Sequence, residues 1–136
     1  MLQWLAKRKR ATNAAASGRD AVLVCDDDYA VREAYKLILS ERYDLKLAAH
    51  GREAIKLLKR QPIKVMILDL KMPELDGLAV LKQVRDTAPA TRVIISTGYR
   101  SIETAQEAAR LGCHDYLMKP FEPKDVLTAV RQAFDR

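Results

Sequence analysis

The feature that most limits the fold of this chain is an alternation of short apolar runs and longer amphipathic segments. Five apolar runs occupy residues 21–25, 44–49, 63–68, 92–96 and 114–118. Between them, apolar residues recur at helical spacing, and proline or glycine marks several of the joints. Strands that alternate with helices form a parallel sheet with helices on both faces. The sequence therefore predicts an α/β protein built from five βα units.

Capping and turn residues set the expected helices. We expect a first helix from a cap at Asp28 to about residue 40 and a second from His50 to Pro62. A third helix should run from about residue 78 to Pro89, and a fourth from a cap at Ser101 to Gly112. A fifth should begin at Pro123.

The strand order follows from chain connectivity. Right-handed crossovers, and central strands that are the most apolar, favour the doubly wound, flavodoxin-like order 2-1-3-4-5. The run at residues 44–49 alternates apolar and polar residues, which is typical of an edge strand. The first and third strands are then neighbours, and ligands of such sheets bind at the carboxyl ends of the strands where the order reverses.

Aspartates stand at this expected ligand site. Asp26, Asp27 and Asp28 follow the first strand, and Asp69 follows the third. Carboxylates that converge in one pocket oppose each other's ionisation unless a cation compensates. Mg²⁺ prefers oxygen ligands and usually takes one or two carboxylates from a protein. We predict a magnesium site with Asp27 and Asp69 as ligands and Asp26 holding a metal-bound water, whereas Asp28 is a helix cap.

Two further strand ends offer groups that suit a phosphoryl group. Thr97 follows the fourth strand and supplies a hydroxyl, and Lys119 follows the fifth and supplies a positive charge. Taken singly, such a threonine is more often a cap and such a lysine a surface residue. Together with Mg²⁺ they would surround a group on Asp69 with one hydroxyl and two positive centres. Phosphoryl transfer needs mainly positioning and charge stabilisation, so the set points to that chemistry.

Four segments resemble the receiver domain of two-component response regulators. They are VLVCDDD (residues 22–28), VMILDLKMPELDG (residues 65–77), VIISTGY (residues 93–99) and DYLMKPF (residues 115–121). The resemblance covers residues 20–136, which we take as the receiver domain, after a basic tail or linker at residues 1–19.

The resemblance implies a role for each residue of the acidic pocket. Asp69 would be the phospho-acceptor, and Asp26 and Asp27 the acidic pair of the Mg²⁺ site. The backbone carbonyl of Lys71 would be a further Mg²⁺ ligand. Lys119 would contact the phosphoryl oxygens.

The resemblance also implies a switch. Phosphorylation would draw the Thr97 hydroxyl towards Asp69, and the ring of Tyr116 would turn inward. The face made by the fourth helix, the fifth strand and the fifth helix would then change shape and bind a downstream protein. A phosphorylation-linked dimer stays open, and so does the plainer interpretation of Tyr116 as a core aromatic. Pro120 matches a family proline that follows a cis peptide bond.

The expected function is phosphorelay signalling and not turnover catalysis. The phosphoryl group would come from a histidine kinase or phosphotransfer protein, and autophosphatase activity would be slow. We expect a single-domain response regulator, with a receiver module of a longer regulator as the alternative. A phosphatase of the haloacid dehalogenase type would need an aspartate where Lys71 stands. A nucleotide-binding module would need a glycine-rich loop where the three aspartates stand.

The basic character of the chain is concentrated in its first nineteen residues. They hold five basic residues and no acid, and subtracting these five from the net charge of +6 leaves +1 for the rest. We expect a solvated arm without a function of its own, and no direct nucleic-acid binding by the domain. A weak membrane or nucleic-acid contact of the tail, or a helix end that needs a partner, stays open.

Nothing in the sequence predicts export or a membrane span. No apolar run reaches the roughly 18 residues that a transmembrane helix needs. The apolar residues near the start precede the basic residues, the opposite of a secretory signal. Cys25 and Cys113 follow no metal or redox spacing and are expected to be reduced thiols. We therefore expect a cytoplasmic protein.

Overall fold

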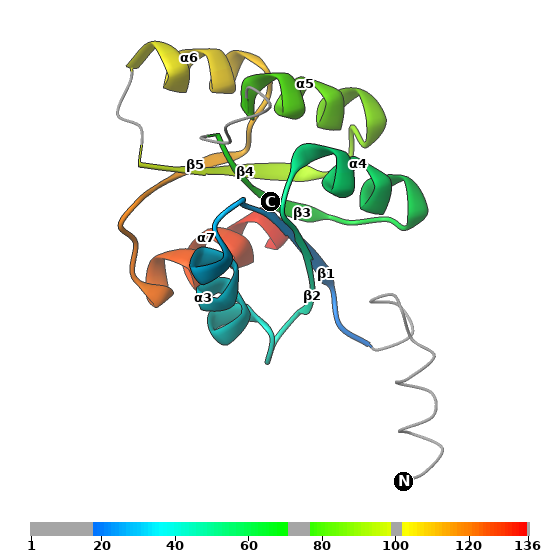
Figure 1. Ribbon diagram of the computed structural model, residues 1–136, viewed down its shortest axis with the longest axis vertical. Helices are drawn as coiled ribbons and strands as arrows, with labels where there is room; N and C mark the ends of the chain where they lie inside the picture. The colour runs from blue at the N-terminus through cyan, green and yellow to red at the C-terminus, as the bar shows by residue number, and fades with distance from the viewer. Residues whose placement is uncertain (1–17, 71–76, 99–101, 136) are drawn as a thin grey trace, which may run out of the picture.

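The strands form one five-stranded parallel sheet in the order β2-β1-β3-β4-β5 (Figure 1). The computed structural model describes residues 18–70, 77–98 and 102–135. The strands are β1 (Ala21–Cys25), β2 (Asp44–Ala48), β3 (Val65–Asp69), β4 (Arg92–Thr97) and β5 (Asp115–Met118). The predicted flavodoxin-like order 2-1-3-4-5 is confirmed, and with it the reversal of order between β1 and β3.

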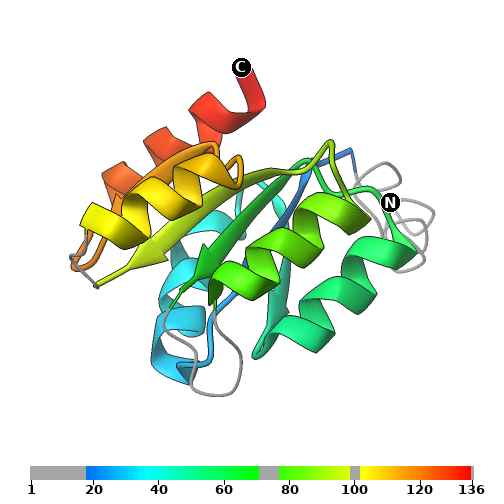
Figure 2. The ribbon, with the colours of Figure 1, turned by 90° about the horizontal axis from the view of Figure 1, so that it is seen from above.

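Helices cover both faces of the sheet (Figure 2). They are α3 (Tyr29–Leu39), α4 (Gly51–Arg60), α5 (Gly77–Thr87), α6 (Ile102–Arg110) and α7 (Pro123–Asp135). The helices α4, α5 and α6 contribute to the apolar core on one face, and α3 and α7 to the core on the other. This two-sided cover explains why β1 and β3 are apolar at nearly every position, because every residue of both strands is buried.

Two expected features of the elements are confirmed at residue level. The Oδ1 atom of Asp28 accepts hydrogen bonds from the backbone N–H of Ala30 at 2.9 Å and of Val31 at 3.4 Å, so Asp28 caps α3. Four of the five residues of β2 are only partly buried, as expected of an edge strand. The cap predicted at Ser101 lies outside the described residues.

The third strand begins later than predicted. The apolar run suggested a start at Ile63, whereas β3 begins at Val65 and continues to Asp69. Ile63 is buried in the core, and its carbonyl accepts a hydrogen bond of 2.6 Å from the hydroxyl of Thr91. It is therefore apolar because it packs against the core and not because it lies in the strand.

The start of α5 packs closely against the backbone at the end of β3. A Cβ atom placed on Gly77 would lie 2.5 Å from the carbonyl oxygen of Leu70 and inside contact distance of the Leu70 Cα. Leu70 directly follows Asp69 in the chain. The glycine therefore lets the helix approach the strand end that carries the predicted phospho-acceptor.

Candidate functional site

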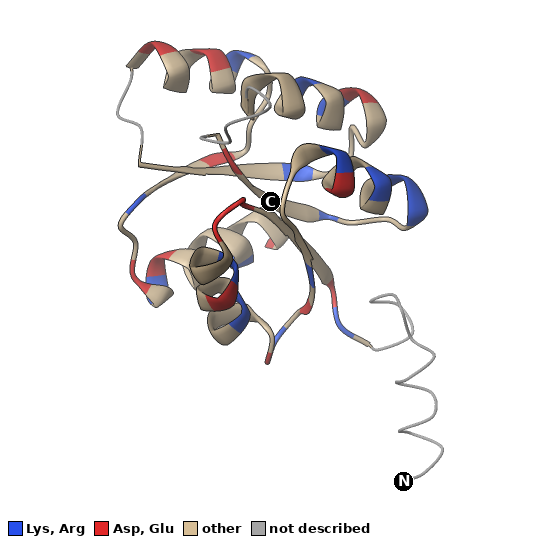
Figure 3. Ribbon diagram, in the orientation of Figure 1, with Lys and Arg blue, Asp and Glu red and all other residues tan. Residues whose placement is uncertain are grey.

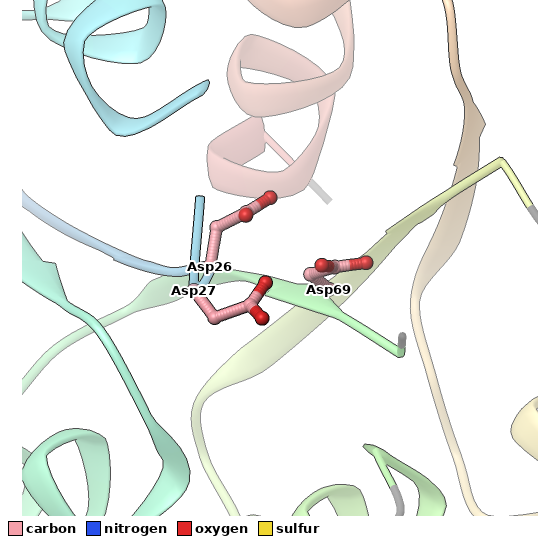
Figure 4. A group of neighbouring side chains, drawn as sticks. All are labelled: Asp26, Asp27 and Asp69. Atoms are coloured by element: carbon pink, nitrogen blue, oxygen red, sulfur yellow. The ribbon is translucent and has the colours of Figure 1, made fainter. Parts of the chain in front are cut away.

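Three carboxylates meet where β1 and β3 end (Figure 4). One oxygen from each of Asp26, Asp27 and Asp69 lies within 4.8 Å of the others. Asp26 and Asp69 are 1 % and 3 % exposed, whereas Asp27 is exposed to solvent. These three residues are here called the acidic pocket, in which two of the acids are buried and Asp27 is exposed to solvent.

Lys119 brings a positive charge into this pocket from the end of β5. Its Nζ atom lies 3.0 Å from Oδ2 of Asp26 and 3.7 Å from Oδ1 of Asp69. Its side chain is 25 % exposed, so the ion pairs are screened less than those on the open surface. One lysine cannot balance three ionised carboxylates. The donor set of clustered carboxylate oxygens therefore fits a divalent, oxygen-preferring cation.

Asp26 is held firmly by its own surroundings. Its Oδ1 accepts a hydrogen bond of 2.9 Å from the backbone N–H of Asp28, and its Oδ2 accepts one from Lys119. The guanidinium of Arg32 donates a hydrogen bond of 2.7 Å to the Asp26 backbone carbonyl. Both carboxylate oxygens of Asp26 thus have donors within the chain, while Asp27 is the exposed acid of the cluster.

Thr97 and Tyr116 lie on the neighbouring strands β4 and β5. Thr97 is fully buried and is one residue beyond Ser96, the register partner of Asp69. The Thr97 carbonyl accepts a hydrogen bond of 2.9 Å from the backbone N–H of Lys119. Tyr116 packs against the core shared with α4, α5 and α6, and this burial, with a smaller effect of Cys113, raises its pKa. The structure thus places Thr97 at the carboxyl end of β4, at the same sheet edge as the acidic residues, and Tyr116 partly buried within β5.

One predicted metal ligand and most of the predicted tail belong to parts of the chain that the structure does not describe. Lys71, whose carbonyl was predicted as a metal ligand, lies outside the described residues, as do residues 1–17 of the predicted tail.

The peptide bond between Lys119 and Pro120 is cis, as the resemblance implies.

Cys25 contributes no charge to the pocket. Its thiol is fully buried at the end of β1, next to Asp26. The pKa of Cys25 is raised to about 12, chiefly because the thiol is buried. The nearby carboxylates of Asp26 and Asp69 make smaller contributions to this rise. The thiol is therefore neutral at physiological pH.

A buried polar pair beneath the pocket was not predicted. The hydroxyl of Tyr35 on α3 donates a hydrogen bond of 2.9 Å to Oγ of Ser96, and both residues are fully buried. The Tyr35 ring also packs against Phe121, with ring centroids 5.3 Å apart. Burial raises the pKa of Tyr35, the Ser96 hydrogen bond opposes this rise, and Asp26 and Asp69 add to it. Tyr35 thus connects α3 to β4 and to the segment that follows Lys119.

We expect Tyr35→Phe and Ser96→Ala each to lower the free energy of unfolding by about 1–2 kcal/mol, because each leaves one buried hydroxyl without its partner. The double variant removes both hydroxyls and should lose less than the sum of the single losses. Urea unfolding of the four proteins measures this coupling. Strictly additive losses would show that the hydrogen bond does not stabilise the fold.

The fold and the pocket together define a class. The chain is a doubly wound α/β protein whose acidic pocket lies at the carboxyl ends of the strands, at the reversal of strand order. A model of the response regulator receiver domain family matches residues 22–131, and the chain belongs to that family.

Individual relatives agree with this assignment. The chain is 35 % identical over 113 residues to the transcriptional regulatory protein ZraR of Escherichia coli, an alignment that covers 82 % of this chain and 26 % of ZraR. The crystal structure of a CheY-like response regulator receiver domain protein from Methanospirillum hungatei has a TM-score of 0.83 at 29 % identity, covering 86 % of this chain and 94 % of that one.

A second similar solved structure contains a phosphorylated aspartate. It is a response regulator protein from Burkholderia pseudomallei, described with a phosphorylated aspartic acid, a calcium ion and citrate. Its TM-score is 0.77 at 30 % identity, covering 85 % of this chain and 69 % of that one.

The family places this chain among signalling domains, which work with kinases and output domains and are not typical enzymes. The chain spans about a quarter to a half of the length of the curated relatives that it matches. Within the described residues, no helix has both the length and the apolar character needed to cross a bilayer.

Proposed function

We propose that this chain receives a phosphoryl group on Asp69 from a histidine kinase or phosphotransfer protein, in a reaction that requires Mg²⁺. The observation that carries the proposal is the pocket itself, in which Lys119 and three carboxylates from two neighbouring strand ends come together. The Burkholderia pseudomallei relative with its phosphorylated aspartic acid supports the choice of an aspartate as acceptor.

The proposed transfer is an in-line displacement at phosphorus. A carboxylate oxygen of Asp69 attacks the phosphorus of a phosphohistidine, a phosphorus–oxygen bond forms, and the phosphorus–nitrogen bond breaks. The departing imidazole nitrogen keeps the electron pair and takes up a proton. Lys119, whose Nζ lies 3.7 Å from Oδ1 of Asp69, is positioned to pair with an oxygen of the transferred group. The hydroxyl of Thr97 would donate to another.

Asp27 and Asp69 would hold the metal directly, Asp26 would hold it through a water, and the carbonyl of Lys71 would complete the protein ligands. Bound there, Mg²⁺ would neutralise negative charge on the transferring group. The two donors that already engage the Asp26 carboxylate support its less direct role, and the exposure of Asp27 supports a direct one. The calcium ion in the Burkholderia pseudomallei relative also supports a cation in this class of protein.

The test is phosphorylation by a small donor. The protein is incubated with acetyl phosphate and Mg²⁺, and intact mass should show one added phosphoryl group that is lost again slowly. The same incubation with excess EDTA should give no gain in mass. Unmodified protein in the presence of Mg²⁺ would refute the proposal.

The proposed output is a switch from Thr97 to Tyr116. Drawing the Thr97 hydroxyl towards the phosphoryl group would free space for the Tyr116 ring and change the face of α6, β5 and α7, where a downstream protein would bind. Moving a two-state equilibrium from 1:99 to 99:1 needs about 5.5 kcal/mol. A few charge-assisted hydrogen bonds of about 1.5–3 kcal/mol each can supply that amount.

We expect Thr97→Ala to accept the phosphoryl group but to lose most of the response on the face of α6, β5 and α7. The reason is that the variant lacks the hydroxyl that would report phosphorylation to Tyr116. Amide hydrogen exchange, compared before and after treatment with acetyl phosphate, measures the response. An unchanged response in Thr97→Ala would remove this threonine from the switch.

The domain organisation of the whole protein is also a proposal. We keep the single-domain response regulator, acting through direct protein contact, with a receiver module of a longer regulator as the alternative. The greater length of the curated relatives gives the alternative its support. Size-exclusion chromatography with and without phosphorylation tests whether a dimer forms.

A further inference from the structure

Lys119 lies on a connecting segment and not within a strand or helix. The strand β5 ends at Met118, and α7 begins at Pro123. On its amino side the segment is fixed to β4, because Met118 is the register partner of Thr97 and the Lys119 N–H donates a hydrogen bond of 2.9 Å to the Thr97 carbonyl. In Figure 3 this segment carries a basic position, and the segment between β1 and α3 carries acids.

The carboxyl side of the segment is anchored through Phe121. This side chain is partly buried against the core that α3 and α7 cover, whereas its neighbours Pro120 and Glu122 are exposed. The Phe121 ring packs against the ring of Tyr35 on α3, with centroids 5.3 Å apart, and Tyr35 is fully buried. Only Pro120 separates Phe121 from Lys119, so this contact limits how far the backbone of Lys119 can move.

Tyr35 also reaches the strand that carries Thr97. Its hydroxyl donates a hydrogen bond of 2.9 Å to Oγ of Ser96, which is the register partner of Asp69 and the residue before Thr97. One side chain of α3 therefore contacts both β4 and the segment that follows Lys119. These are two of the segments that surround the acidic pocket.

Core packing alone does not account for the buried hydroxyls. Tyr35 lies in a cluster of apolar residues that includes Val24, Ile67 and Val130. An apolar side chain of similar size would fill this space without burying a polar group. A buried hydrogen bond is directional, so it fixes one position of the ring where apolar contacts alone allow several. Phe121 thus packs against a ring whose place is set by β4.

We propose that Tyr35 is a positioning residue for phosphoryl transfer, which keeps Lys119 in reach of Asp69 by packing against Phe121. The inference rests on the proposed function of the pocket and gives Tyr35 no contact with the transferred group. With the ring in place, Nζ of Lys119 stays near Oδ1 of Asp69, at 3.7 Å. Without the ring, the segment between β5 and α7 gains freedom, and a displacement of about 1 Å is enough to slow such a reaction strongly.

The first test compares two substitutions of Tyr35. Tyr35→Leu removes the ring, and its rate of phosphorylation by acetyl phosphate at fixed Mg²⁺ should fall about tenfold. Tyr35→Phe keeps the ring and should recover most of the rate. Phe121→Leu changes the other partner at a half-buried position and should also slow the reaction. A rate in Tyr35→Leu and Phe121→Leu equal to that of the unchanged chain would overturn the proposal.

The matched control is a second aromatic pair on the same face of the sheet. Tyr43 stacks on Phe134 with the same centroid separation of 5.3 Å, and both residues pack against the same core. Tyr43 directly precedes β2, so it lies at the opposite edge of the sheet from the acidic pocket. Tyr43→Leu should lose stability in urea unfolding and keep its phosphorylation rate. An equal loss of rate in Tyr43→Leu and Tyr35→Leu would assign the effect to core stability and overturn the proposal.

A double-mutant cycle tests whether Tyr35 acts through Lys119. Lys119→Met removes the charge that Tyr35 is proposed to position. Adding Tyr35→Leu to this variant should slow the remaining reaction by less than about twofold, because the two changes affect one interaction. The same fold-loss from Tyr35→Leu with and without Lys119 would show that Tyr35 does not act through the lysine.

A last measurement does not depend on phosphorylation. Relaxation of ¹³C-labelled lysine Cε, measured without metal or phosphodonor, reports the fast motion of the Lys119 side chain. The Lys119 signal is identified by its absence from Lys119→Met. Its motion should increase in Tyr35→Leu and stay unchanged in Tyr43→Leu. Equal motion in Tyr35→Leu and the unchanged chain would overturn the proposal, whereas failure of the unchanged chain to gain a phosphoryl group would refute the proposed function instead.

Discussion

A chain carrying Asp69→Asn is expected to take up no phosphoryl group from acetyl phosphate, while the unchanged chain takes up one. The amide offers no anionic oxygen to attack phosphorus, and it removes one of the three clustered carboxylates. The same change should raise the stability of the metal-free protein, because it relieves repulsion with Asp26 and Asp27. Intact mass measures the first effect and urea unfolding the second.

The matched control is Asp28→Asn, on the next acid along the same segment. Asp28 caps α3 through its Oδ1 atom and is not a member of the three-carboxylate cluster. Asparagine is also a good helix cap, so this variant should fold and accept the phosphoryl group almost normally. If Asp69→Asn still takes up a phosphoryl group, or if only Asp28→Asn fails to take one up, Asp69 is not the phospho-acceptor.

Gly77→Ala should lower the free energy of unfolding by about 3 kcal/mol, at the upper end of the range for overpacked sites. Alanine is normally the better helix residue, so propensity alone predicts the opposite sign. The added methyl group would overlap the backbone of Leu70, which cannot move aside as a flexible side chain can. Urea unfolding checks the loss of stability, and the rate of phosphorylation checks whether Asp69 is displaced.

Gly98→Ala is the control for this substitution. A Cβ atom on Gly98 would have Cβ of Lys119 as its nearest neighbour, at an ordinary contact distance of 3.8 Å. Its effect on stability should be small, within about 1 kcal/mol. Equal stability of Gly77→Ala and the unchanged chain would show that α5 can shift away from β3 without cost.

The sequence predicted the sheet well because its signals are local. Continuous apolar runs, alternating with helical ones, predicted the strands, and the rule of right-handed crossovers, with the most apolar strands at the centre, favoured their order. Asp28 marked the start of α3. The acids could be placed together in advance because the favoured strand order made β1 and β3 neighbours, so that their carboxyl ends lie side by side. The late start of β3 escaped prediction because Ile63 is apolar for packing and not for pairing.

What the sequence did not predict depends on contacts between distant residues. Tyr35 and Ser96 are 61 positions apart, and nothing in either segment indicates that their hydroxyls meet. The bond from Arg32 to the Asp26 carbonyl depends on the path of the chain between β1 and α3.

The acidic pocket joins Asp26, Asp69 and Lys119, which lie at the ends of three different strands. None of these strands can bring its group to the others until the whole sheet has assembled. A partly folded or truncated chain therefore lacks the acceptor site altogether, however much local structure it retains. If the proposed chemistry holds, each phosphorylated molecule in a cell is also a molecule that has completed folding, so damaged copies cannot transmit a false signal.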